Sequence, residues 1–141
     1  MPSENVTLVR SIIDAWNDRG DPSLDAYHDD AEWDFRGWGF NLRGTFHGTE
    51  SFAQMLEGLR EEWDEIRVEA EQYVEAGDRV AFFGRFYSRR PGRSGLEISD
   101  SGTCVFTFSE GKIVRFSLLR DRDEALSLLG VPEPSAQVTR R

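Results

Sequence analysis

The stretch IRVEAEQYVEAGDRVAFFGRFY, residues 66–87, decides the fold. Its first half alternates: charged side chains occupy most odd positions, and the even positions are mostly apolar, at Ile66, Val68, Ala70 and Val74. A period of two predicts a strand with one face on a core and the other in water. Gly77 and Asp78 predict a hairpin turn. The returning segment, 79–90, is apolar on both faces, which is typical of a central strand.

The chain before residue 66 follows a helical period instead. Residues 4–17 carry apolar side chains at the spacing of an amphipathic helix, with Ser3 as the N-cap and Gly20 beyond the end. A short second helix is predicted within 21–30, because an Asp and a Pro open this segment as the cap and the first helical residue. The alternation in AEWDF predicts a strand at 31–35. A third helix is marked by Phe52, Met55, Leu56, Leu59 and Trp63.

Two further strands follow the hairpin, SDSGTCVFTF at 99–108 and KIVRFSLLR at 112–120. The closing segment predicts a short helix, because Asp121 can cap it, Glu124 completes a capping box and Gly130 ends it. The chain therefore begins with helices around a short strand and continues with long strands. This order predicts an α+β fold, in which helices pack on one face of a curved antiparallel sheet.

Length and charge exclude several classes of protein. A chain of 141 residues fits one domain, which we expect over 1–131, followed by a flexible tail over 132–141. The formal net charge is −9, with 26 acidic against 17 basic residues. Nucleic acids and anionic membranes attract clustered Lys and Arg, so the sequence predicts neither as a partner.

Cys104 is the only cysteine, which excludes an internal disulfide and a Cys-based zinc site. His28 and His47 belong to no spaced ligand motif, so we expect no metal and no cofactor. No apolar run approaches the ~20 residues that span a bilayer. The opening MPSENVTLVR lacks the basic-then-apolar order of a signal peptide. We therefore expect a cytoplasmic protein.

Five local stretches carry a family resemblance. They are AWNDRGD (15–21), HDDAEW (28–33), HGTESFAQML (47–56), FTFSEGKIVRF (106–116) and RDRDEALSLLG (120–130). In this order they resemble the NTF2-like superfamily, and within it the SnoaL-like or ketosteroid-isomerase-like proteins. The resemblance covers about residues 5 to 131.

The resemblance implies a cone with three helices from the N-terminal half on the concave side of the sheet and a short C-terminal helix. It implies a hydrophobic pocket inside the cone, and a homodimer formed through the outer face of the sheet. Matching the family hairpin onto this sequence also points Ala81, Arg85, Tyr87 and Arg120 inward. The expected ligand-binding residues are Trp16, Tyr27, Trp33, Phe35, Phe83, Cys104, Phe106, Phe116 and Leu118.

The catalytic patterns of the superfamily match this sequence poorly. The positions of the isomerase base, tyrosine and acid fall on Phe35, Ile12 and Cys104, which argues against steroid isomerisation by that mechanism. The epoxide-hydrolase pattern of an Arg and an Asp two residues apart is met only by Arg85 with Tyr87.

An acid must therefore come from elsewhere. Asp100 paired with Arg85 or Arg120 could hold a water for acid–base work, or the pair could be a structural ion pair. A cyclase would need one inward acid, from Asp100, or from Asp34 if a bulge turned it inward.

Two hypotheses remain. The first is a small-molecule-binding protein for a hydrophobic carbonyl or carboxylate compound. It would be a cofactor-independent acid–base enzyme (isomerase, cyclase, or hydratase or hydrolase) if Arg85, Tyr87, Asp100 and Arg120 act in catalysis. The second is a non-catalytic ligand-binding or dimerisation module of the same fold.

Trp38, in a Gly-rich loop, is a candidate gate of the pocket.

Overall fold

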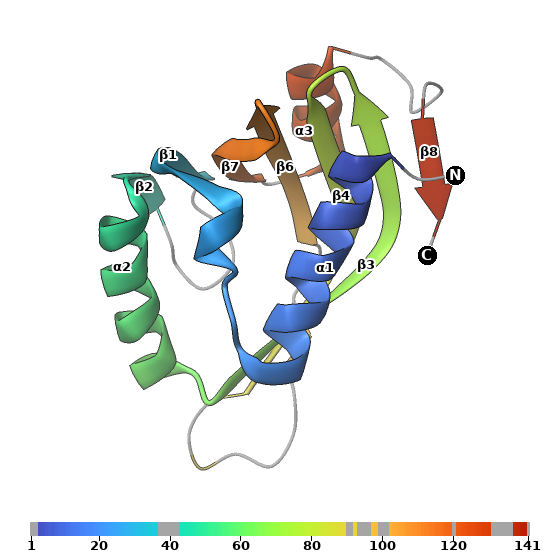
Figure 1. The fold of residues 1–141 in the computed structure, drawn as a ribbon. Coiled ribbons are helices and arrows are strands. Elements are labelled where there is room, and N and C mark those ends of the chain that lie inside the picture. Colours follow the sequence, from blue (N-terminus) through green and yellow to red (C-terminus); the bar gives the residue numbers. More distant parts are fainter. Residues whose placement is uncertain are drawn as a thin grey trace.

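The computed structural model describes residues 3–36, 43–89, 92, 97–98, 102–119, 121–130 and 137–140. Within them, helices and strands follow one another as Figure 1 shows. The helical elements are α1 (Glu4–Arg19), the 3-10 turn η1 (Leu24–Ala26), α2 (Thr49–Glu62) and α3 (Arg122–Leu129). The strands are β1 (Tyr27–Arg36), β2 (Arg43–His47), β3 (Glu65–Ala76), β4 (Arg79–Arg89), β5 (Glu97–Ile98), β6 (Gly102–Ser109), β7 (Lys112–Leu119) and β8 (Gln137–Arg140).

The strands form one sheet in the order β2-β1-β7-β6-β4-β3-β8, with β5 beside β4. The hairpin predicted from the decisive stretch is present, since β3 and β4 pair antiparallel around Gly77. The sheet is mixed rather than wholly antiparallel, because β1 pairs parallel to β7. These two strands are far apart in the sequence, so no tight turn forces them to run in opposite directions. Helices packed on this sheet make the predicted α+β fold.

The ends of α1 and α3 are capped as the sequence predicted. The Ser3 hydroxyl accepts a hydrogen bond from the Val6 N–H, and Gly20 ends α1 in the left-handed conformation. The Asp121 carboxylate accepts from the Glu124 N–H at the start of α3. Arg79 donates to the Leu128 carbonyl near the other end of α3, where a cation offsets the negative end of the helix dipole.

The two faces of the sheet carry different helices. The inner face, which includes Phe82, Cys104 and Phe116, packs against α1 and α2. The outer face, which includes Phe83 and Val105, packs against α3. The expected placement of the helices on the concave side is therefore met by α1 and α2, whereas the C-terminal helix covers the opposite face.

The predicted second helix is wrong. Only the 3-10 turn η1 forms, and β1 begins directly after it at Tyr27. Asp21 does not cap a helix of ordinary length; its carboxylate accepts from the Ser23 N–H at 2.8 Å, which makes a tight turn. Tyr27 then pairs with Ile113 of β7, so sheet formation overrides the local helical signal.

A bulge interrupts the pairing of β3 with β4. The register shifts between Ala70 and Gln72, so Glu71 is the extra residue. Gly84 of β4 lies opposite this bulge, and a Cβ there would lie 1.9 Å from the Glu69 carbonyl oxygen. Only glycine allows the two backbones to approach this closely.

The end of α1 covers part of the edge of β3 that faces away from β4. The Asn17 amide donates to the Val68 carbonyl at 2.7 Å, and its oxygen accepts from the Val68 N–H at 2.9 Å. The Trp16 indole donates to the Ile66 carbonyl at 2.8 Å. These side chains occupy backbone groups that another strand would otherwise pair with.

Asn17→Ala is expected to lower the free energy of unfolding by roughly 1–3 kcal/mol, because it leaves both backbone groups of Val68 without their partner. Urea denaturation measures the loss. Asp18→Ala, on the exposed neighbouring position, is the matched control and is expected to change stability by less than about 0.5 kcal/mol. Equal effects of the two variants would contradict the role of Asn17.

Further along β3, the edge is paired by β8, whose residue Gln137 lies opposite Glu75. The Ser3 hydroxyl donates to the Glu75 carboxylate at 2.7 Å, so the start of α1 reaches the same place. The sequence predicted no strand within 132–141.

None of the described helices is long and apolar enough to cross a membrane.

Candidate functional site

A cavity of about 140 Å³ lies between α1, α2 and the inner face of the sheet. Its wall is formed by side chains of both helices and of β1, β3, β4, β6 and β7, and almost all of the surface inside it is apolar. The residues of this wall are Ile12, Ile13, Trp16, Pro22, Tyr27, Phe35, Phe52, Met55, Leu56, Leu59, Ile66, Val68, Phe82, Phe86, Cys104, Phe106, Phe116 and Leu118.

Strand register brings the sheet part of the wall together. Cys104 of β6 lies opposite Leu118 of β7 and opposite Phe82 of β4. Phe106 pairs with Phe116 in the same way. Since paired residues of adjacent strands point to the same face, the order of the strands alone gathers these side chains.

The helices form the wall of the cavity opposite the sheet. Ile12, Ile13 and Trp16 come from one face of α1, at the i, i+1, i+4 spacing of a helical stripe. The contribution of α2 has the i, i+3, i+4, i+7 spacing of a helical stripe, at Phe52, Met55, Leu56 and Leu59. The two helical stripes recognised in the sequence thus meet across the cavity.

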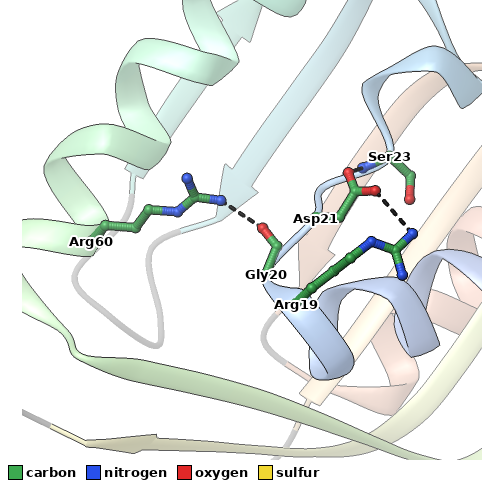
Figure 2. A network of polar contacts seen from close by, with 5 residues as sticks. All are labelled: Arg19, Gly20, Asp21, Ser23 and Arg60. Atoms are coloured by element: carbon green, nitrogen blue, oxygen red, sulfur yellow. Dashed lines mark hydrogen bonds and ion pairs between the residues drawn. The ribbon is translucent and has the colours of Figure 1, made fainter.

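Polar contacts hold the segment between α1 and η1, which forms one margin of the cavity. Figure 2 shows the Arg60 side chain reaching from α2 to the Gly20 carbonyl, with which it makes a hydrogen bond of 2.6 Å. The Arg60 guanidinium also lies 5.9 Å from the centre of the Trp16 ring. Beside it, Asp21 forms an ion pair with Arg19 at 3.2 Å. These contacts tie α2 to the end of α1.

Two groups with polar atoms stand in the apolar wall, Tyr27 and Cys104. Burial raises the pKa of the Tyr27 phenol, and the nearby Cys104 adds to the rise. Burial also raises the pKa of the Cys104 thiol well above its ordinary value. Both groups therefore keep their protons at neutral pH and are able to donate a hydrogen bond.

Trp33 lies directly behind the wall. It is fully buried, stacks on Phe52 with ring centres 4.3 Å apart, and lies 5.0 Å from the Tyr27 ring. The Trp33 indole opposes the rise in the pKa of the Tyr27 phenol. Its N–H makes no hydrogen bond of normal geometry with any of the described residues.

The structure places most of the expected ligand-binding residues on the wall of the cavity. These are Trp16, Tyr27, Phe35, Cys104, Phe106, Phe116 and Leu118, with Trp33 behind them. The prediction that Phe83 binds the ligand is wrong. Its side chain packs with α3 on the outer face, where the Arg122 guanidinium lies 4.2 Å from its ring centre. Ala81, expected inward for the same reason, lies in the same outer cluster.

The expectation that Arg85 points into the cavity is also wrong. Its side chain is 53% exposed and forms an ion pair with Glu71 at 3.5 Å. Tyr87 follows it at strand spacing and does not belong to the wall. The inward residues of β4 are Phe82 and Phe86, one position away from the prediction.

Asp34 faces away from the cavity, as alternation in β1 predicted. Its carboxylate pairs with Arg115 at 3.1 Å, and Arg115 also pairs with Glu32 at 3.1 Å. Asp100, Arg120 and Trp38 lie outside the described residues. The part of the wall that the structure describes therefore holds no carboxylate and no arginine.

Phe82, Phe86, Ile66 and Val68 were missing from the predicted site. Alternation already turned Ile66 and Val68 toward a core. In β4 the useful signal was Arg85: a charged residue marks the face that water reaches, so Phe82 and Phe86 belong to the other face. Within the described residues no group of three or more His, Cys, Asp or Glu side chains is placed to hold a metal ion.

Comparison with known proteins agrees with this architecture. The sequence matches the family model of the SnoaL-like domain over residues 9–116. The chain belongs to the SnoaL-like family. The search of curated proteins found no match.

Solved structures resemble this SnoaL-like protein over most of its length. An NTF2-like protein of unknown function from Burkholderia pseudomallei has a TM-score of 0.74 at 23% identity, covering 91% of this chain and 98% of its own. TerC, crystallised with polyporic acid, has a TM-score of 0.72 at 22% identity, with 91% and 99% covered. A putative SnoaL-like polyketide cyclase from Jannaschia has a TM-score of 0.65 at 19% identity, with 92% and 94% covered. These likenesses establish the NTF2-like fold.

Proposed function

We propose that this SnoaL-like protein binds a small hydrophobic molecule in the cavity between α1, α2 and the sheet. The observation that carries the proposal is a cavity of about 140 Å³ with an almost wholly apolar wall. An apolar cavity of roughly this volume is large enough to take up a benzene-sized molecule. Two neighbours of the same fold were crystallised with small molecules, TerC with polyporic acid and a Catenulispora acidiphila protein with trimethylamine.

The expected affinity follows from the area that a ligand would bury. An aromatic ring buries roughly 150–250 Å², which is worth about 4–6 kcal/mol at ~25 cal/mol per Å². Part of this is lost to the restricted motion of the bound ligand. A single-ring compound is therefore expected to bind with a Kd near 1 mM, and larger compounds that fill the cavity more fully should bind more tightly.

Binding without catalysis is the function that the described wall supports best. General acid–base chemistry needs a group that can exchange a proton near neutral pH, whereas Tyr27 and Cys104 both have raised pKa values. Arg85 and Tyr87 do not face the cavity. Asp100 and Arg120 stay the candidates for an isomerase, cyclase or hydratase of this fold. The cytoplasmic location and the homodimer also stay predictions.

Calorimetric titration with α-methylstyrene tests the proposal. We expect saturable binding to the parent protein and at least about tenfold weaker binding to Cys104→Leu, because the larger side chain occupies part of the cavity. Thr107→Leu adds bulk to the same strand on the outer face and is the matched control, with unchanged binding. Absence of binding to the parent protein, or equal binding to both variants, would count against the cavity as the binding site.

A further inference from the structure

The apolar cavity has one polar spot, made by three side chains. Tyr27 and Cys104 belong to the wall, and Trp33 lies behind Tyr27 with the two rings 5.0 Å apart. All three are buried, with 5% or less of each residue exposed. The wall around them consists of aliphatic and aromatic side chains.

Donors outnumber good acceptors at this spot. The indole of Trp33 can only donate, the phenol of Tyr27 donates one proton and accepts, and the thiol of Cys104 is a weak donor and a weak acceptor. The Trp33 N–H has no hydrogen-bond partner of normal geometry among the described residues. The Tyr27 hydroxyl has one proton to donate, and the described side chains of the wall around it offer no strong acceptor.

The described part of the wall holds no cation that would compensate a negative charge. Its described residues include no arginine or lysine, and a carboxylate moved out of water into such a cavity would lose its hydration without an ion partner. An uncharged acceptor loses much less hydration. The expectation of a carboxylate ligand rested on Arg85 and Arg120: Arg85 lies on the outer face with Glu71, and Arg120 lies outside the described residues.

We propose that the cavity selects an uncharged ring compound with one hydrogen-bond acceptor, such as a ketone oxygen, which the Tyr27 hydroxyl binds. Trp33 is a positioning residue, because its ring packs between Tyr27 and Phe52 and holds the Tyr27 ring in place. Cys104 borders the same spot and adds a second, weaker donor. This inference rests on the proposed binding function and adds the chemical class of the ligand.

The test compares two ligands of nearly equal shape in three proteins. Acetophenone and α-methylstyrene differ only by an oxygen in place of a methylene group, and benzoate supplies the charged relative. Calorimetric Kd values are measured for the parent protein, Tyr27→Phe and Tyr73→Phe. Tyr73 is buried but lies outside the wall of the cavity, so its variant removes a hydroxyl elsewhere. Melting curves check that each variant folds.

The expected result is a Kd for acetophenone about tenfold higher in Tyr27→Phe, which corresponds to one hydrogen bond. The Kd for α-methylstyrene should stay within twofold, Tyr73→Phe should match the parent protein, and benzoate should not bind. If both neutral ligands bind and Tyr27→Phe weakens them equally or not at all, the inference is overturned while the binding function stands. Tight binding of benzoate would overturn it too. If no ligand binds the parent protein, the proposed function itself fails.

Discussion

Gly84→Ala is expected to destabilise the protein by more than about 4 kcal/mol, or to prevent folding altogether. The added Cβ would lie 1.9 Å from the Glu69 carbonyl oxygen and 2.9 Å from the Cα of Ala70. Both are backbone atoms of the neighbouring strand, held in place by the pairing of β3 with β4, so neither can move away cheaply. Chemical denaturation followed by circular dichroism measures the loss.

Gly58→Ala is the matched control, because it makes the same chemical change on an exposed position inside α2. A Cβ at Gly58 meets nothing within 4 Å. Alanine favours a helix interior over glycine, so this variant should be more stable by about 0.5–1 kcal/mol. If Gly84→Ala lowers the free energy of unfolding and Gly58→Ala raises it, the loss at Gly84 comes from the close approach of the two backbones. It does not come from a general effect of replacing glycine by alanine. A Gly84→Ala protein that melts within a few degrees of the parent protein would contradict the conclusion that only glycine fits opposite the bulge.

Above about pH 9 the free energy of unfolding is expected to fall steeply. Burial raises the pKa of Cys104 above its ordinary value of 9.0 and that of Tyr27 above its ordinary 10.0. In the unfolded chain both groups lose their protons at the ordinary values, while the folded protein keeps them. The folded state then binds more protons, so stability drops as pH rises, by about 1.4 kcal/mol per pH unit for each group. Lys112 is the only lysine, which leaves few other groups in this range.

Two variants separate the contributions of Cys104 and Tyr27 to this pH dependence. Cys104→Val removes the thiol at nearly constant volume, so the decline between about pH 9 and pH 10 should largely disappear. Tyr27→Phe should leave that decline and reduce the one above about pH 10. Urea denaturation at half-unit pH steps measures both. A parent protein whose stability is flat between pH 8.5 and 10.5 would show that neither group keeps its proton on folding.

The sequence predicted those parts of the fold in which a single pattern decides the outcome. In β1, acidic and aromatic residues alternate, so Trp33 and Phe35 could be assigned to the core and Asp34 to the opposite face. The caps of α1 and α3 were equally clear, because each uses a side chain with one strong local preference. These assignments need only neighbouring residues.

Other parts of the site depend on contacts that no local pattern contains. The segment 79–89 is apolar on both faces, and the prediction took Phe83 rather than Phe82 from the family hairpin, although the charge of Arg85 marked the outer face. A one-residue slip exchanges the faces of a strand, and this slip moved Phe83 and Arg85 to the wrong side. The prediction of a helix near Tyr27 was wrong for a related reason, because the pairing of Tyr27 with β7 determines the conformation of this segment.

The position of α3 has a consequence for self-assembly. Its residues Ala125, Leu126 and Leu129 pack on the outer-face cluster that includes Phe83 and Val105. Charged pairs on that face include Arg85 with Glu71 and Arg115 with Glu32. A homodimer formed there would have to accommodate these charges at its interface, so its stability would depend on how they pair across two subunits rather than on buried apolar area. Such an assembly would respond strongly to ionic strength.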